Sequence, residues 1–118
     1  KLEPVRASYK DANKPVEWVQ IHKLPDYVYF NHSVHVNRGV SCVECHGRVD
    51  EMDEVRHEKH FSMTFCLDCH RDPNKRLRPL DKITDLAYER SKDPTNKDRN
   101  FVKEWHVKTS ENCSACHR

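Results

Sequence analysis

The chain has 118 residues, of which 36% are hydrophobic and 34% charged. A domain of this length usually draws nearly half of its residues from the apolar set, so the sequence predicts one domain that lacks material for an ordinary packed core. The net charge of +2 excludes a strongly basic surface for nucleic acid, and the short apolar runs exclude a segment that spans a bilayer. Six cysteines and nine histidines favour disulfides, metals or a large cofactor as the missing part of the core.

In chain order, the sequence predicts short elements separated by loops. Residues 1–15 carry charges and prolines without a period, so we expect an extended N-terminal segment ahead of a single domain at 16–118. Residues 16–21 have the composition of a short strand. Asn31 is suited to an N-cap and Gly39 to the position just past a helix end, which predicts a short helix between them.

The later elements are predicted from the same local signals. Ser62 is suited to the N-cap of a helix that carries the second of the cysteine pairs described below. Residues 84–91 and 98–107 have the pattern of helices, and the stretch between them is predicted to be a loop. Ser110 or Thr109 is expected to cap a last helix at the end of the sequence.

All six cysteines fall in three Cys-x-x-Cys pairs, and a histidine follows each pair at once. The motifs are Cys42-Val-Glu-Cys45-His46, Cys66-Leu-Asp-Cys69-His70 and Cys113-Ser-Ala-Cys116-His117. In this arrangement the two sulfurs lie about one helical turn apart, where they can form thioethers to the two vinyl groups of one haem. The adjoining histidine then reaches the iron from the same side. The motifs therefore predict three covalently bound haem c groups, with the three motif histidines as proximal ligands.

Two other interpretations of the cysteines explain less. Residues 46–65 separate the first two pairs, which fits a zinc ribbon with four cysteine ligands. That scheme leaves Cys113, Cys116 and the three following histidines without a role. A disulfide framework accounts for the even number of cysteines but not for their spacing.

Each haem iron has a second axial position, and six histidines remain to fill it. His32 and His35 lie three residues apart on nearly the same face of the predicted helix. One iron cannot take both of them as well as its motif histidine, so we expect two neighbouring haems to share this helix. The third distal ligand is left open by the residues alone, with methionine a rival because an axial methionine raises the haem potential. Its candidates are His22, His57, His60, His106 and Met63.

Several stretches of the chain resemble the multihaem cytochrome subunit of bacterial alternative complex III, a quinol-oxidising membrane complex. They are Lys14 to Val36, with His22, His32 and His35 inside it, Cys45-His46-Gly47-Arg48-Val49-Asp50-Glu51-Met52, Ser62 to Arg71, and Asn112 to Arg118. That subunit typically carries five haem motifs, and this chain carries three. The resemblance implies the C-terminal trihaem part of such a subunit or a stand-alone trihaem relative. It also implies redox partners among the iron–sulfur or cytochrome subunits of a respiratory complex.

The arrangement Phe30-x-His32-x-x-His35, followed by Cys-x-x-Cys-His, is also similar to the class III multihaem cytochromes c. These are small periplasmic carriers with two histidines on each iron. In that class the first histidine ligates the first haem and the second histidine ligates another. The resemblance therefore implies that His32 pairs with His46 and that His35 pairs with His70.

The third distal ligand departs from the pattern of that class. There a histidine stands four residues before a motif cysteine, whereas this chain has Ser62 at the matching position. The departure weighs against His60. It leaves His22, which lies inside the long stretch similar to the complex III subunit. We therefore assign His22 to the third haem, opposite His117.

The predicted fold is mainly α with little regular secondary structure, made of short helices and loops wrapped around three covalently bound haems. Because porphyrin would supply much of the core, we expect the protein without haem to be largely unfolded. Filled axial positions favour electron transfer over substrate chemistry, so we expect no catalytic residues. Two alternatives to a respiratory-complex subunit are a free periplasmic trihaem carrier and a multihaem reductase with one open iron. Covalent haem attachment places the chain in the periplasm or on the outer face of the cytoplasmic membrane.

Overall fold

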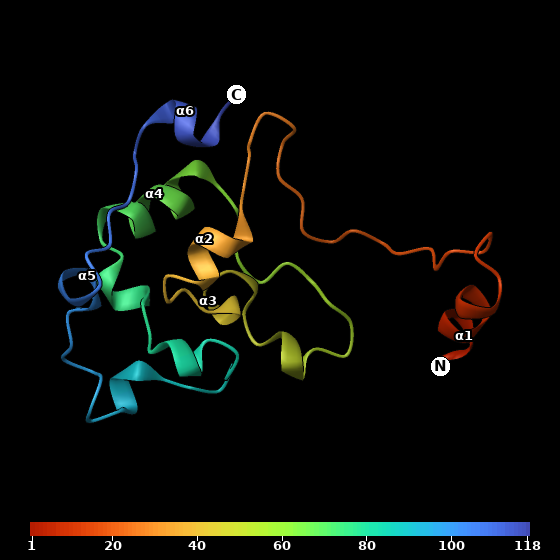
Figure 1. The fold of residues 1–118 in the computed structure, drawn as a ribbon, viewed down its shortest axis with the longest axis horizontal. Coiled ribbons are helices and arrows are strands. Elements are labelled where there is room, and N and C mark those ends of the chain that lie inside the picture. Colours follow the sequence, from red (N-terminus) through yellow and green to blue (C-terminus); the bar gives the residue numbers. More distant parts are fainter.

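The computed structural model describes all residues 1–118 as six short α-helices joined by loops and single turns (Figure 1). The helices are α1 (Glu3–Lys10), α2 (His32–Val36), α3 (Cys42–His46), α4 (Met63–Arg71), α5 (Phe101–Glu104) and α6 (Cys113–Cys116). The 3₁₀ turns are Val49–Glu51, Asn74–Arg76, Leu80–Lys82 and Arg90–Lys92. Extended pairing is limited to isolated bridges, which join Val28 to His117 and Val40 to Leu77. This architecture confirms the prediction of a mainly α fold with little regular secondary structure.

The N-terminal segment differs from the extended chain that we predicted. Residues Glu3–Lys10 form α1, in which Pro4 occupies the first turn, Glu3 lies at the positive end of the helix dipole and Lys10 at the negative end. These local preferences outweigh the lack of an apolar period. Figure 1 shows α1 well away from the other helices, at the end of a long irregular arm. The predicted strand at residues 16–21 is also absent, because this arm has no neighbouring strand with which to pair.

The short helix α2 follows the local signals of the sequence closely. Asn31 caps it as predicted, and its Oδ1 accepts a hydrogen bond from the Ser33 amide at 2.9 Å. Gly39 follows the helix with a φ of +94°. A side chain there would be strained, and an added Cβ would lie only 2.6 Å from the Trp105 ring.

The caps of α4 and α6 give one confirmed prediction and one correction. Ser62 caps α4, and its Oγ accepts a hydrogen bond from the Phe65 amide at 3.1 Å. The cap of α6 is Asn112, not Ser110 or Thr109. Those two residues contact the second motif instead: the Thr109 hydroxyl donates to the His70 carbonyl oxygen, and the Ser110 carbonyl accepts from the His70 ring. This long-range contact is invisible to a local capping rule.

Residues 72–107, which we call the connector lobe, join the second motif to the third. The predicted helix at 84–91 is wrong, since only a single turn begins at Arg90, and the predicted helix at 98–107 is reduced to α5. The Arg90 side chain instead ties the loops of this lobe together. Its guanidinium donates to the backbone carbonyl oxygens of Asn74, Leu77, Asn96 and Arg99. These bonds satisfy carbonyl groups in the segments on either side of Arg90.

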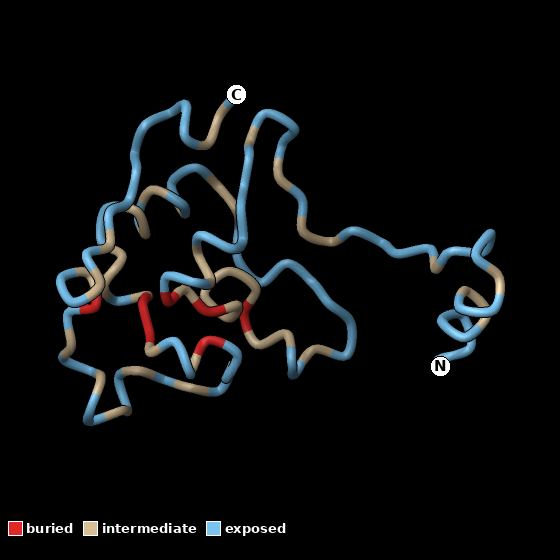
Figure 2. The backbone as a smooth tube through the Cα atoms, in the orientation of Figure 1, coloured by how far each residue is buried: buried red, intermediate tan, exposed pale blue.

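The apolar core lies in the connector lobe and consists of Leu77, Ile83 and Phe101 (Figure 2). The Phe101 ring is fully buried, with the guanidinium groups of Arg90 and Arg99 4.6 and 4.5 Å from its centre. Trp105 stacks on the same ring. By contrast, α2, α3, α4 and α6 contain no buried residue. None of the helices has the length and apolar character needed to cross a membrane.

Candidate haem-binding site

The first histidine pair joins α2 to the first cysteine motif. The rings of His32 and His46 are nearly parallel, with an interplanar angle of 9° and centres 6.3 Å apart. With a metal–nitrogen bond of about 2 Å on each side, two imidazoles on one metal ion have ring centres about 6 Å apart. The separation of these two rings therefore fits an iron atom between them.

The second pair uses the next histidine of the same helix. The rings of His35 and His70 have centres 6.1 Å apart and planes inclined at 45°. Rotation of an imidazole about its bond to a metal does not alter this separation, so the second pair fits an iron atom equally well. Because His32 and His35 lie three residues apart, α2 presents one to each motif.

Hydrogen bonds fix which ring nitrogen each histidine offers. The Nδ1 atoms of His35, His70 and His117 lie 2.8, 2.7 and 3.3 Å from backbone carbonyl oxygens. The carbonyls belong to Asn31, Ser110 and Tyr27 respectively. An Nδ1–H that donates to a carbonyl leaves the Nε2 lone pair free and orients the ring, which is the usual arrangement of a metal-binding histidine. The backbone thus prepares all three rings for iron at Nε2.

His22 lies in a different place from the one that we predicted. Its ring contacts that of His46 edge-on, with centres 4.3 Å apart, and lies 4.6 Å from the ring of His57. No ring contact joins His22 to His117, whose aromatic neighbour is Tyr27 at 5.8 Å. The pairing of His22 with His117 is therefore not formed in the structure. Loop packing beside the first motif decides this position, and the sequence carries no local signal for it.

Burial and neighbouring histidines favour the neutral form of His46 and His22. Burial lowers the pKa of His46, and the neighbouring His22, His32 and His57 lower it further. Burial also lowers the pKa of His22, with a further contribution from His57. The neutral ring is the form that can bind a metal. Moreover, His22 Nε2 is buried without a hydrogen-bond partner, so the His46 cluster holds an unsatisfied nitrogen close to the first motif.

The other candidates for a third distal ligand lie apart from His117. His57 Nε2–H donates to the Ile21 carbonyl oxygen at 2.8 Å, so only its Nδ1 is free. His60 and His106 are exposed, and Met63 is 66% exposed. The structure brings none of these side chains into ring contact with His117. Two of the distal ligands that the sequence predicted, His32 and His35, thus lie beside motif histidines in the structure. The sequence did not identify a distal ligand beside His117.

None of the six cysteines is joined to another in a disulfide. Burial raises the pKa of Cys45, Cys66 and Cys69, so these thiols stay protonated near neutral pH. No three histidine, cysteine or acidic side chains converge in a group that could hold a metal ion by themselves. A zinc ribbon built from the first two pairs is therefore not formed. The residues present fit haem, for which paired sulfurs and facing imidazoles are the required donors.

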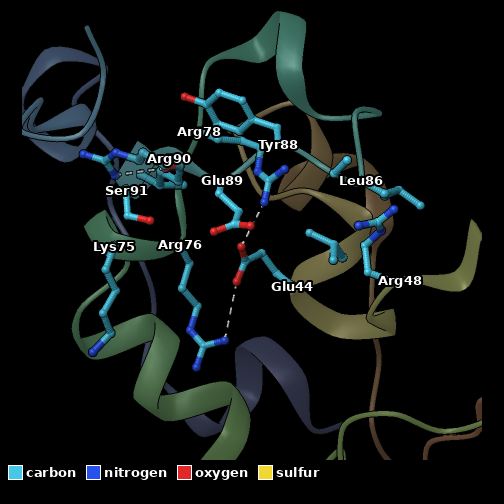
Figure 3. A pocket seen from close by; sticks show the side chains of 13 residues that line it. Glu44, Arg48, Lys75, Arg76, Arg78, Leu86, Tyr88, Glu89, Arg90 and Ser91 are labelled. Carbon is cyan, nitrogen blue, oxygen red and sulfur yellow. Dashed lines mark hydrogen bonds and ion pairs between the residues drawn. The ribbon is translucent and has the colours of Figure 1, made fainter. Parts of the chain in front are cut away.

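Glu44, between the two cysteines of the first motif, faces a cavity of about 410 Å³ that sequence reasoning missed (Figure 3). Across it lie Arg76 and Arg78 of the basic connector at residues 74–79, together with Tyr88. Arg78 is only 5% exposed, so its side chain lies inside the protein rather than in solvent. The run of basic residues was a signal for such a cluster, but the carboxylate partner could be identified only in three dimensions.

Comparisons with known proteins identify the family of the chain. Residues 28–118 match the family described as cytochrome c7 and related cytochrome c. The chain is also similar to cytochrome c-552 of Desulfotalea psychrophila, with 29% identity over 80 residues. That match covers 60% of this chain but only 16% of the length of the relative. The family implies covalently bound c-type haem and electron transfer. The chain belongs to the family of cytochrome c7 and related cytochromes c.

Proposed function

We propose that the chain is a trihaem cytochrome c that relays electrons between redox partners in the periplasm or at the outer face of the cytoplasmic membrane. One observation carries this proposal: α2 presents His32 and His35 to two different motif histidines, each at a separation that fits one iron. Two irons held by one five-residue helix are close neighbours. Close spacing is what electron transfer between haems requires.

Cysteines and histidines have different roles in holding the haems. Each cysteine pair supplies the two thioether bonds, and His46, His70 and His117 are the proximal ligands. His32 and His35 are the distal ligands of the first two haems. When bound, haem supplies one-electron chemistry as its iron changes between the ferric and ferrous states. With His32 and His46 on one iron and His35 and His70 on the next, no position would be left there for a substrate.

The proposal is tested by counting the haems and titrating them. An intact mass of the purified protein is expected to exceed the polypeptide mass by three haems. Reductive titration is expected to take up three electrons per chain, reversibly. A mass with fewer than three haems, or cysteines that stay alkylatable in the native protein, would contradict the trihaem assignment.

We further propose that the relay operates within a membrane-associated, quinol-oxidising complex similar to alternative complex III. The support is the long resemblance at residues 14–36, which includes the exposed arm and reaches α2. Trp18 and Val19 of this arm are each 81% exposed, as expected of side chains that contact another subunit. Gel filtration after mild solubilisation of native membranes is the test. Elution with iron–sulfur or cytochrome subunits supports the subunit role, and a free 14.0 kDa protein supports the alternative of a periplasmic carrier.

A second candidate function rests on the surroundings of the third motif. The aromatic neighbour of His117 is Tyr27 rather than a histidine. An iron with a single protein ligand has a free axial position, which is the requirement for a multihaem reductase. Carbon monoxide distinguishes the two functions. Binding of one carbon monoxide per ferrous chain supports the reductase, and no binding supports a pure electron carrier.

A further inference from the structure

An ion-pair cluster connects the first motif to the segment that follows the second. Glu44 Oε1 lies 3.2 Å from the Arg78 guanidinium, and Glu44 Oε2 lies 3.7 Å from the Arg76 guanidinium (Figure 3). Glu44 belongs to α3, between the two cysteines of the first motif, whereas the arginines lie just beyond α4. The cluster of Glu44, Arg76 and Arg78 therefore spans the two motifs that share α2.

The arginines are held in place by more than the carboxylate. Arg78 is 5% exposed, donates to the Asp85 carbonyl oxygen at 3.1 Å and lies over the Tyr88 ring. Arg76 lies over the Phe65 ring of α4, and its Nε is buried without a hydrogen-bond partner. Charges that are fixed and partly removed from water are screened much less than mobile surface charges. The field of this cluster therefore extends into the surrounding protein.

Both motifs lie beside this cluster. Glu44 stands between Cys42 and Cys45 in α3. The Arg76 guanidinium lies 5.5 Å from the centre of the Phe65 ring, and Phe65 directly precedes Cys66 in α4. The cluster therefore lies next to residues that attach the first haem and residues that attach the second. Two guanidinium groups and one carboxylate leave the cluster with a net charge of +1.

We infer that the Glu44, Arg76 and Arg78 cluster raises the reduction potentials of the first two haems. A nearby positive charge disfavours ferric iron, which carries one more positive charge than ferrous iron. The inference rests on the proposed trihaem function. Its residues act on the haems through their charges, and none of them binds iron.

The test changes the charge of the cluster in both directions. In Arg76→Gln the potentials of two haems are expected to fall while the third stays unchanged, and Arg76→Lys is expected to restore them. In Glu44→Gln, where the side-chain oxygen can still accept from Arg78, the same two potentials are expected to rise. Opposite shifts from two partners of one ion pair distinguish charge from simple structural damage. The potentials are measured haem by haem in a redox titration followed by NMR.

Arg6→Gln is the matched control. Arg6 is also paired with a carboxylate, that of Glu3, but it belongs to α1 at the far end of the N-terminal arm (Figure 1), so the loss of its charge is expected to leave the haem potentials unchanged. Unchanged potentials in Arg76→Gln and Glu44→Gln, or equal shifts of all three haems, would overturn the inference. The intact mass of each variant is measured first. A protein without three haems contradicts the proposed function, whereas three haems with unmoved potentials contradict only the role of the cluster.

Discussion

Phe101 is fully buried in the connector lobe, whereas the four helices that carry the motifs and the distal histidines contain no buried residue. The lobe closes its own core with the Phe101 ring and the carbonyl bonds of Arg90. The haem-bearing part, which comprises the helices α2, α3, α4 and α6, instead leaves Phe30 and Met63 exposed. One part of a very polar chain thus builds a core from side chains, and the other presents ligands around which haem completes a core.

The largest expected effect comes from removal of the haems. In a variant with all six cysteines replaced by serine, we expect the haem-bearing part to unfold, because it has no other core. The connector lobe is expected to keep slow amide exchange, for example at Leu77 and Trp105, whose amides donate to Pro73 and Phe101 within the lobe. Hydrogen exchange resolved by residue measures this difference. Uniform protection across the chain would contradict the comparison, and so would the complete loss of protection.

Phe101→Ala is expected to destabilise the connector lobe and to leave the haem-bearing part intact. It removes the centre of the lobe core and leaves every haem ligand in place, at a cost of about 3–5 kcal/mol in the free energy of unfolding. Denaturant unfolding of the holoprotein measures the loss, and the haem absorption of the folded variant is expected to match that of the parent. Leu80→Ala is the control, since Leu80 is an exposed side chain of the same lobe. Equal destabilisation by both changes would show that the lobe has no core of its own.

Gly39→Ala acts at the junction of the two regions. Gly39 has a φ of +94°, its carbonyl accepts from the Arg78 amide at 3.0 Å, and an added Cβ would clash with Trp105. The backbone strain alone is worth roughly 1–2 kcal/mol. We expect a lower unfolding free energy together with a disturbed absorption of the haems that share α2. Asn37→Ala, on an exposed residue at the end of α2, is expected to leave that absorption unchanged.

Arg71→Ala is expected to have the smallest effect. Arg71 Nε lies 3.0 Å from a carboxylate oxygen of Glu111, which ties α4 to the segment before α6. Both side chains are more than half exposed, so the pair is screened and contributes at most about 1 kcal/mol. Thermal unfolding at low and high salt measures this contribution. A loss that is large and independent of salt would mean that the third motif depends on this contact.

The parts of the structure that the sequence predicted are those with a local physical cause. The caps at Asn31 and Ser62 follow from side-chain oxygens next to free amides. The position of His32 and His35 on nearly the same face of α2 follows from helix geometry. The features that the sequence did not predict depend on contacts between residues far apart in the chain. Arg90 donates to the carbonyl oxygens of Asn74 and Arg99, which lie sixteen and nine residues away from it. The His22 ring packs beside the first motif against the rings of His46 and His57, which lie far from it in sequence.

The central claim is that α2 supplies the distal ligands of two different haems, and the electron paramagnetic resonance spectrum of ferric histidine variants tests it most directly. His32→Ala and His35→Ala are each expected to convert one low-spin iron to high spin, and the double variant is expected to convert two. His106→Ala, which removes an exposed histidine, is expected to convert none. A double variant that gains no high-spin iron beyond the parent, or only one, would contradict the claim.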